Sequence, residues 1–127
     1  ALKDSLSVMV VDDMATSRGL IIMALEEMGI KKIDFRKDGA DALQSLVAKP
    51  VHLVISDYNM PGMDGLGLLK SLRENRITSR IGFILVSGRI TPEIMSTGKA
   101  LGMNNYIQKP FSTPQLKACI QAVVGPL

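Results

Sequence analysis

Cysteine and histidine are nearly absent from this chain of 127 residues, and their scarcity excludes whole classes of site. A single cysteine, Cys119, cannot form a disulfide framework or a cysteine-rich zinc site. A single histidine, His52, cannot supply a metal centre built from several imidazoles. Tryptophan is missing and aromatic residues make up only 4% of the chain, so a stacking platform for single-stranded nucleic acid is not expected.

The chain also lacks long hydrophobic runs. Its longest apolar run covers residues 20–25, far short of the roughly 20 residues that a membrane-spanning helix needs. Residues 1–5 contain no apolar signal core. These observations predict a cytoplasmic protein that does not enter the membrane. The length predicts a single domain, which we expect to be monomeric.

Apolar runs typical of β-strands alternate with segments typical of helices along the whole chain. The predicted strands cover residues 8–11, 33–36, 52–56, 83–86 and 104–108. The predicted helices cover residues 16–28, 39–48, 65–74 and 112–124, with a further helix between Thr91 and Gly102. Residues typical of helix N-caps stand at the start of the last four helices, namely Asp38, Asp64, Thr91 and Ser112, and Ser112 has capping-box spacing with Gln115.

The strands read as continuous runs of valine, isoleucine and leucine, which is typical of parallel sheets covered by helices on both faces. Helical connections of this length fit right-handed crossovers between parallel strands. The sequence therefore predicts an open α/β domain of three layers, built from five β-α units. The functional edge of such a domain lies at the carboxyl ends of its strands.

Charged and hydroxyl side chains stand directly after four of the predicted strands. Asp12 and Asp13 follow the first strand, and Asp57 follows the third. Ser87 follows the fourth strand and Lys109 the fifth. Because the carboxyl ends of parallel strands share one edge of the sheet, we expect three carboxylates, one hydroxyl and one ammonium to converge there.

A cluster of carboxylates favours a divalent cation, because the cation removes their mutual repulsion. Oxygen ligands without histidine or cysteine favour Mg²⁺ over zinc, and Mg²⁺ readily binds phosphate oxygens. One carboxylate could act as a nucleophile and form an aspartyl-phosphate, while the metal ion and the lysine stabilise the transferring phosphoryl group. The net charge of the chain is +3. The four charged residues of this cluster sum to −2, so the charges of all other residues sum to +5. Because those basic residues are scattered, they do not favour nucleic-acid binding.

Four motifs in the order found here resemble the signature of the response-regulator receiver domain. They cover residues 10–13 (VVDD), 56–65 (SDYNMPGMDG), 86–88 (VSG) and 109–111 (KPF). The resemblance extends over essentially the whole chain and is greatest to single-domain chemotaxis regulators (CheY-like). It implies one receiver domain over residues 1–127 without an output domain. It also implies a (βα)5 flavodoxin-like fold with strand order 2-1-3-4-5, for which such regulators are a known example.

The resemblance implies a role for each charged residue at the strand ends. Asp57 would be the phosphoacceptor, and it would hold Mg²⁺ together with Asp12, Asp13 and the backbone carbonyl of Asn59. Lys109 would pair with a phosphoryl oxygen, held by a peptide bond to the following proline that is typically cis in the family.

The resemblance also implies a switch between two arrangements. Ser87 would move to hydrogen-bond the phosphoryl group, and Tyr106 would then turn inward. A static Tyr106 is the plainer alternative, because aromatic residues are common in strands. The switched surface would comprise the last two helices and the strand between them. Its candidate residues are Ile90, Ile94, Met95, Lys99, Tyr106 and Gln108.

As a member of this family, the chain would receive its phosphoryl group from a phosphohistidine on a sensor histidine kinase. It would catalyse that transfer and its own slow dephosphorylation, and a separate phosphatase is a further candidate partner. Arg89 borders the expected path of the attacking water, which leaves the dephosphorylation rate open. For a chemotaxis regulator, the output partner would be the flagellar motor switch. A phosphate sink that drains the kinase and binds no motor is the alternative with the same chemistry.

Other α/β proteins fit the sequence less well. Phosphatases of the haloacid dehalogenase type carry an Asp-x-Asp pair after the first strand, whereas Asp12 and Asp13 are adjacent. A flavodoxin-like electron carrier shares the expected fold, but an acidic first loop would repel a flavin phosphate.

Three further expectations concern residues outside the cluster. We expect Met23 and Met28 to lie in the core and Cys119 to pack within the last helix. We expect His52 to stand at the start of a strand without a functional role.

Overall fold

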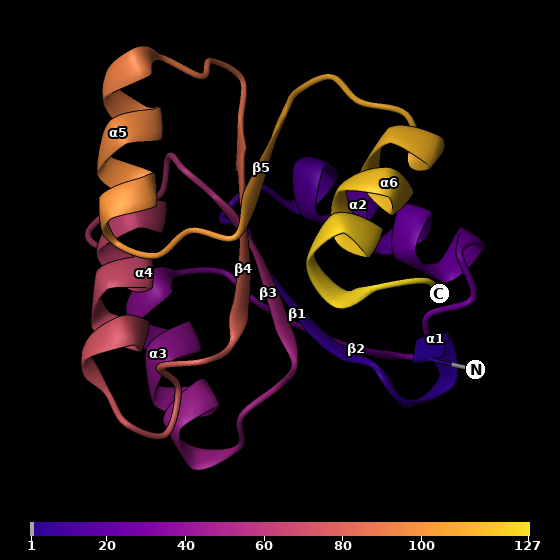
Figure 1. The fold of residues 1–127 in the computed structure, drawn as a ribbon, viewed down its shortest axis with the longest axis horizontal. Helices are drawn as coiled ribbons and strands as arrows, with labels where there is room; N and C mark the ends of the chain where they lie inside the picture. Colours follow the sequence, from indigo (N-terminus) through magenta and orange to yellow (C-terminus); the bar gives the residue numbers. More distant parts are fainter. Residues whose placement is uncertain (1) are drawn as a thin grey trace.

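The computed structural model describes residues 2–127 and joins all five predicted strands in one parallel sheet (Figure 1). The strands are β1 (Ser7–Val11), β2 (Lys32–Arg36), β3 (Leu53–Asp57), β4 (Gly82–Ser87) and β5 (Asn105–Gln108). The helices are α1 (Leu2–Ser5), α2 (Ala15–Glu27), α3 (Gly39–Ala48), α4 (Gly65–Glu74), α5 (Pro92–Ala100) and α6 (Thr113–Val124). The strand order β2-β1-β3-β4-β5 confirms the expected order. None of the helices within residues 2–127 is both long enough and apolar enough to cross a membrane.

Helices cover both faces of the sheet, which confirms the three-layer architecture. α2 and α6 lie on one face, whereas α3, α4 and α5 lie on the other (Figure 1). Side chains of the central strands alternate between the two faces: Val10 packs on the side of α2 and α6, and its neighbour Met9 packs on the opposite side. Because both faces are buried, the central strands read as continuous apolar runs in the sequence.

The helix ends carry the signals that the sequence predicts. Each of the four predicted N-cap side chains accepts a hydrogen bond from the backbone N–H three residues further on. Ser112 and Gln115 form the reciprocal capping box. Gly29 and Gly102 follow α2 and α5 with φ of 86° and 89°, a left-handed conformation that favours glycine. These local signals determine where the helices begin and end along the edges of the sheet.

Two features of the N-terminal part differ from the prediction. Met23 is 52% exposed, so its expected core position was wrong, whereas Met28 is buried as expected. α2 buries Ile21, Ala24 and Leu25 on one stripe with Met28, and Met23 falls outside that stripe. The one-turn helix α1 was not predicted, because four residues carry too little periodicity to reveal a helix.

Gly65, the first residue of α4, leaves no room for a side chain. A Cβ atom there would lie 2.5 Å from the carbonyl oxygen of Asp57 and 2.8 Å from Cδ1 of Leu85. We predict that Gly65→Ala lowers the free energy of unfolding by about 1–3 kcal/mol, because backbone and core atoms must shift to admit the methyl group. Urea denaturation measures this change, and a Gly65→Ala protein as stable as the wild type would contradict the packing argument.

Gly19 on α2 offers a matched control for that substitution. A Cβ atom at Gly19 meets nothing within 4 Å, so Gly19→Ala should raise the free energy of unfolding by up to about 1 kcal/mol through helix propensity alone. Opposite signs for the two alanine substitutions are therefore the expected result of the same denaturation experiment.

Cys119 on α6 is buried, as expected, and its thiol donates a hydrogen bond to the carbonyl oxygen of Tyr106 at 3.4 Å. Burial raises the pKa of the thiol from 9.0 to about 11. Because the thiolate is the reactive form, we predict that a thiol reagent at pH 8 modifies the native protein far more slowly than the urea-unfolded chain. Equal labelling rates for the two states would contradict this prediction.

The same pKa shift has a consequence for stability at high pH. The folded protein keeps the thiol proton in a pH range where the unfolded chain has already lost it. The contribution of Cys119 to stability is therefore complete below pH 9.0 and should be lost as the pH rises toward about 11.

Candidate functional site

Three carboxylates and one ammonium meet at the carboxyl edge of the sheet. Asp12 and Asp13 follow β1, Asp57 ends β3, and Lys109 follows β5. The three aspartates each offer an oxygen, and these oxygens all lie within 4.8 Å of one another. The Lys109 Nζ atom lies 3.1 Å from Oδ1 of Asp57 and 3.7 Å from Oδ2 of Asp12. The parallel sheet thus brings these four residues together from chain positions far apart.

Asp12 presents a buried oxygen without a hydrogen-bond donor. Its side chain is fully buried, and Oδ1 accepts a hydrogen bond from the backbone N–H of Met14 at 3.0 Å. Oδ2 is the one buried side-chain polar atom among the described residues that makes no hydrogen bond. An unsatisfied buried carboxylate oxygen is costly, and a cation removes that cost. Two buried carboxylates beside the exposed Asp13 fit a hard divalent ion that keeps water ligands, such as Mg²⁺.

The pKa of Asp57 is raised from its usual value, chiefly by burial. The hydrogen bond and the positive charge of Lys109 oppose this rise, and so does the hydrogen bond from the backbone N–H of Tyr58. The negative charge of Asp12 adds to the rise. Asp57 is therefore a desolvated carboxylate whose charged form depends on neighbouring cations.

Ser87 stands beside this cluster, but its hydroxyl is turned to its own loop. Ser87 is 2% exposed, and its Oγ donates to the carbonyl oxygen of Arg89 at 2.9 Å and accepts from the N–H of Arg89 at 3.2 Å. The backbone N–H of Lys109 donates to the Ser87 carbonyl oxygen at 2.8 Å, and the Lys109–Pro110 peptide bond is cis. The ends of β4 and β5 are thereby joined next to Asp57.

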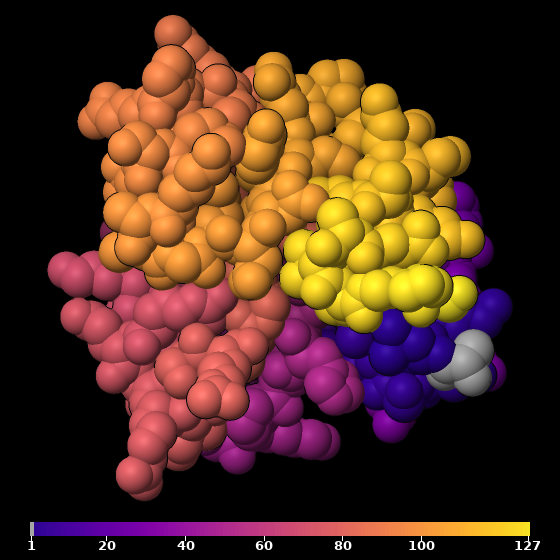
Figure 2. Space-filling view, viewed as in Figure 1, coloured from indigo at the N-terminus to yellow at the C-terminus, as the bar shows by residue number. Residues whose placement is uncertain are grey.

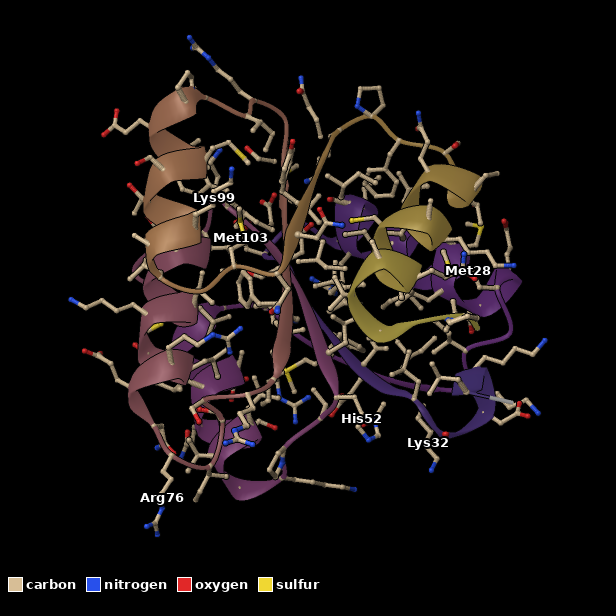
Figure 3. The ribbon with its side chains drawn as sticks, in the orientation of Figure 1. Met28, Lys32, His52, Arg76, Lys99 and Met103 are labelled. Atoms are coloured by element: carbon tan, nitrogen blue, oxygen red, sulfur yellow. The ribbon has the colours of Figure 1, made fainter. Side chains whose placement is uncertain are left out.

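The remaining predicted residues lie at the rim of the site or away from it. Asn59 is exposed in the loop between β3 and α4, and Tyr106 on β5 is 41% exposed. The other candidates for the switched surface lie on β5, on α5 or just before it, with Ile90, Ile94 and Met95 half-buried and Lys99 and Gln108 exposed. α5 adjoins α6 across the segment that contains β5, so the three elements form one continuous face (Figure 2). Lys99 is labelled on this face in Figure 3.

His52 lies at the opposite edge of the sheet, near Lys32 (Figure 3). Its Nδ1 atom accepts a hydrogen bond from the backbone N–H of Ser7 at 2.9 Å, and its backbone N–H donates to Ser7 Oγ at 3.2 Å. His52 thus joins the starts of β1 and β3 and has no contact with the carboxylate cluster.

Two neighbours of the cluster were missed by sequence reasoning. The Lys109 ammonium donates a hydrogen bond to Oγ of Ser17 on α2 at 2.8 Å. The guanidinium of Arg18 donates to the carbonyl oxygen of Asp12 at 2.9 Å and lies 5.0 Å from the centre of the Phe35 ring. The sequence offers one signal for both. Ser17 and Arg18 lie in the first turns of the helix that follows Asp12 and Asp13, and the start of that helix lies next to the carboxyl ends of the strands.

A groove of about 500 Å³ leads away from Lys109 along α2. Its walls are largely apolar and include the side chains of Met14, Leu20 and Met23, which are 61%, 61% and 52% exposed. An apolar surface of this kind beside a charged site is typical of a protein-binding surface. The exposed methionine that the sequence placed in the core therefore belongs to the surface next to the site.

The sequence matches the family described as response regulator receiver domain over residues 8–121. It is 39% identical over 127 residues to a probable chemotaxis protein CheY of Rhizobium etli, covering 100% of this chain and 98% of that protein. Chemotaxis protein CheY-3 of Vibrio cholerae is 30% identical over 116 residues, covering 91% of this chain and 89% of that protein.

Solved structures share the fold. The chemotaxis protein CheY4 of Vibrio cholerae superposes with a TM-score of 0.87 at 28% identity, covering 93% of this chain and 98% of that chain. The receiver domain of a sensor histidine kinase from Pseudomonas aeruginosa PAO1, solved with a magnesium ion in its active site cleft, gives a TM-score of 0.85. That pair is 21% identical and covers 95% of this chain and 98% of the other, which shows a common fold.

Asp12 provides a direct test of cation binding. We predict that millimolar Mg²⁺ raises the free energy of unfolding of the wild type by about 1 kcal/mol or more, because the ion binds the folded state selectively. Asp12→Asn should lose most of this gain, and without Mg²⁺ it should be at least as stable as the wild type, because it removes a repelling charge. Thermal unfolding with and without Mg²⁺ measures both effects.

Glu74→Gln is the matched control, since Glu74 is exposed at the far end of α4 and also loses one negative charge. It should keep the full Mg²⁺ effect. An equal loss in Glu74→Gln and Asp12→Asn would mean that Mg²⁺ acts through overall charge and not through the cluster.

Proposed function

The chain belongs to the response regulator receiver domain family, and on that premise we propose that Asp57 accepts a phosphoryl group and thereby switches a protein-binding surface. One observation carries the proposal: the buried Asp57 carboxylate lies 3.1 Å from the Lys109 ammonium and beside the carboxylates of Asp12 and Asp13. A nucleophile, a fixed positive charge and a set of oxygen ligands for a cation thus share one edge of the sheet. These are the parts that phosphoryl transfer needs, because its catalysis consists mainly of positioning and charge stabilisation.

In the proposed reaction, a carboxylate oxygen of Asp57 attacks the phosphorus of a phosphohistidine. A bond forms between that oxygen and phosphorus, the phosphorus–nitrogen bond breaks, and its electron pair returns to the imidazole nitrogen. The imidazole nitrogen takes up a proton, and the Lys109 ammonium stays beside the phosphoryl oxygens and stabilises the negative charge that they carry onto Asp57. Mg²⁺, held by Asp12, Asp13, Asp57 and the backbone carbonyl of Asn59, would neutralise part of the phosphoryl charge. In the later hydrolysis, water attacks the same phosphorus, the bond between phosphorus and the Asp57 oxygen breaks, and inorganic phosphate leaves with the carboxylate restored.

The proposed switch starts at Ser87. A phosphoryl group adds charge and strong acceptor oxygens next to the Ser87 hydroxyl, which then leaves the backbone of Arg89 and donates to a phosphoryl oxygen. Tyr106, now 41% exposed, turns into the space that the moving loop opens. The face formed by α5, β5 and α6 changes shape, and a partner reads that change.

The phosphodonor is proposed to be a sensor histidine kinase, as the family implies. The apolar groove along α2 supports an approach from that side, because Ser17 and Lys109 line the same groove and Lys109 also contacts Asp57. Such a kinase domain would place the protein in the cytoplasm.

The output partner is proposed to be the flagellar motor switch, since relatives covering most of this chain are named as chemotaxis proteins. A phosphate sink without motor binding is the second candidate, and a dedicated phosphatase would complete either pathway. Binding to the motor switch protein with and without beryllofluoride and Mg²⁺ separates the two. Binding that strengthens with beryllofluoride supports the motor function, and unchanged weak binding supports the sink.

Phosphorylation itself is tested with a small donor. Acetyl phosphate and Mg²⁺ should add one phosphoryl group to the wild type, measured by intact-protein mass spectrometry. Asp57→Asn should abolish the addition, because the neutral amide has no negatively charged oxygen to act as the nucleophile. Glu74→Gln, which changes charge far from the cluster, should be phosphorylated like the wild type. A phosphoryl group on Asp57→Asn at the wild-type rate would overturn the assignment.

A further inference from the structure

The shortest polar contact of the Lys109 ammonium is to neither aspartate. Nζ lies 2.8 Å from Oγ of Ser17, compared with 3.1 Å to Asp57 and 3.7 Å to Asp12. An ammonium only donates hydrogen bonds, so the Ser17 hydroxyl is the acceptor. The two residues are 92 positions apart in the chain, and the fold brings them together at the mouth of the site.

A lysine ammonium needs such an anchor to hold one position. Its four-carbon stem is flexible, and the Lys109 side chain is 29% exposed at the edge of the site. Contact with Asp57 alone would leave it free to move toward the Asp12 oxygen that lacks a donor. A third contact from another element limits that movement.

Ser17 is well placed to act as the anchor because α2 is itself fixed. The helix buries Ile21, Ala24 and Leu25 against the sheet. Its first turn is tied to the end of β1, since the N–H of Met14 donates to the Asp12 side chain and Arg18 donates to the Asp12 carbonyl oxygen. The Ser17 hydroxyl therefore has a defined position relative to the carboxylates.

A hydroxyl also suits this role electrostatically. A further carboxylate in its place would neutralise the Lys109 charge that phosphoryl transfer requires, and would compete with Asp57 for the ammonium. A neutral acceptor orients the ammonium and leaves its charge available to the phosphoryl oxygens.

We infer that Ser17 is a positioning residue for phosphoryl transfer, which acts by holding the Lys109 ammonium over Asp57. The inference rests on the proposed phosphorylation of Asp57. The hydrogen bond of the Ser17 hydroxyl goes to Lys109 and not to Asp57, so its effect on the reaction should pass through Lys109.

The test compares rate constants for phosphorylation by acetyl phosphate at saturating Mg²⁺. Ser17→Ala should be about three- to tenfold slower than the wild type, the size expected for losing one hydrogen bond of ordinary strength while Asp57 and Asp12 still contact the ammonium. Ser17→Thr keeps the hydroxyl and should recover most of the rate. Thr16→Ala is the matched control, because Thr16 lines the same groove on the same helix turn but has no hydrogen bond to Lys109. It should react at the wild-type rate.

A double-mutant cycle separates positioning from a general structural effect. In a Lys109→Met background the ammonium is absent, so adding Ser17→Ala should cause no further loss. Alanine favours helices more than serine, which offsets the lost hydrogen bond to Lys109, so the unfolding midpoint of Ser17→Ala should change little.

If the wild type is phosphorylated, either of two results would overturn the inference and leave the proposed function intact. One is an unchanged phosphorylation rate for Ser17→Ala, and the other is the same slowing by Ser17→Ala in the Lys109→Met background. A wild type that takes no phosphoryl group would instead overturn the proposed function and this inference with it.

Discussion

Three carboxylates at one edge of a sheet repel one another, and the other groups of the site must compensate for that repulsion. Asp12, Asp13 and Asp57 bring their oxygens within 4.8 Å of one another, and a single ammonium stands beside them. Two of the three are buried, so water cannot screen the charges fully. Burial raises the pKa of Asp57, and one oxygen of Asp12 has no donor at all. The Asp12 oxygen without a hydrogen bond and the excess negative charge of the three carboxylates both favour the binding of a cation.

The fold supplies the rigidity that such a charged cluster needs. A parallel sheet buried on both faces places every strand end along one line, and each loop needs only to carry a side chain a short distance. α4 approaches β3 so closely at Gly65 that no side chain fits between them. α2 is tied to Asp12 through Met14 and Arg18. The helices therefore act as fixed walls around the strand ends.

The sequence predicted the architecture and the cluster because both depend on local or topological signals. N-cap residues, continuous apolar strands and polar residues at strand ends are each visible within a few positions. The contact from Ser17 to Lys109 was not predictable, since it depends on side-chain rotamers of residues 92 positions apart. Met23 was misplaced for a related reason: methionine is apolar enough for a core, and only the packed helix shows which stripe faces inward. The roles of the site residues stay predictions until phosphorylation is measured.

The two hydrogen bonds between Ser87 and the backbone of Arg89 make that loop an internal competitor. In the proposed switch, a phosphoryl oxygen on Asp57 would compete for the Ser87 hydroxyl with the backbone of Arg89, which lies within hydrogen-bond distance. Arg89 is exposed, so water can replace the hydroxyl as the hydrogen-bond partner of its backbone once the hydroxyl leaves. The apparent affinity of the hydroxyl for a new acceptor is then reduced by the fraction of time it spends in the loop. In the proposed switch, the loop that contains Arg89 would therefore help to determine how readily the Ser87 hydroxyl changes its hydrogen-bond partner.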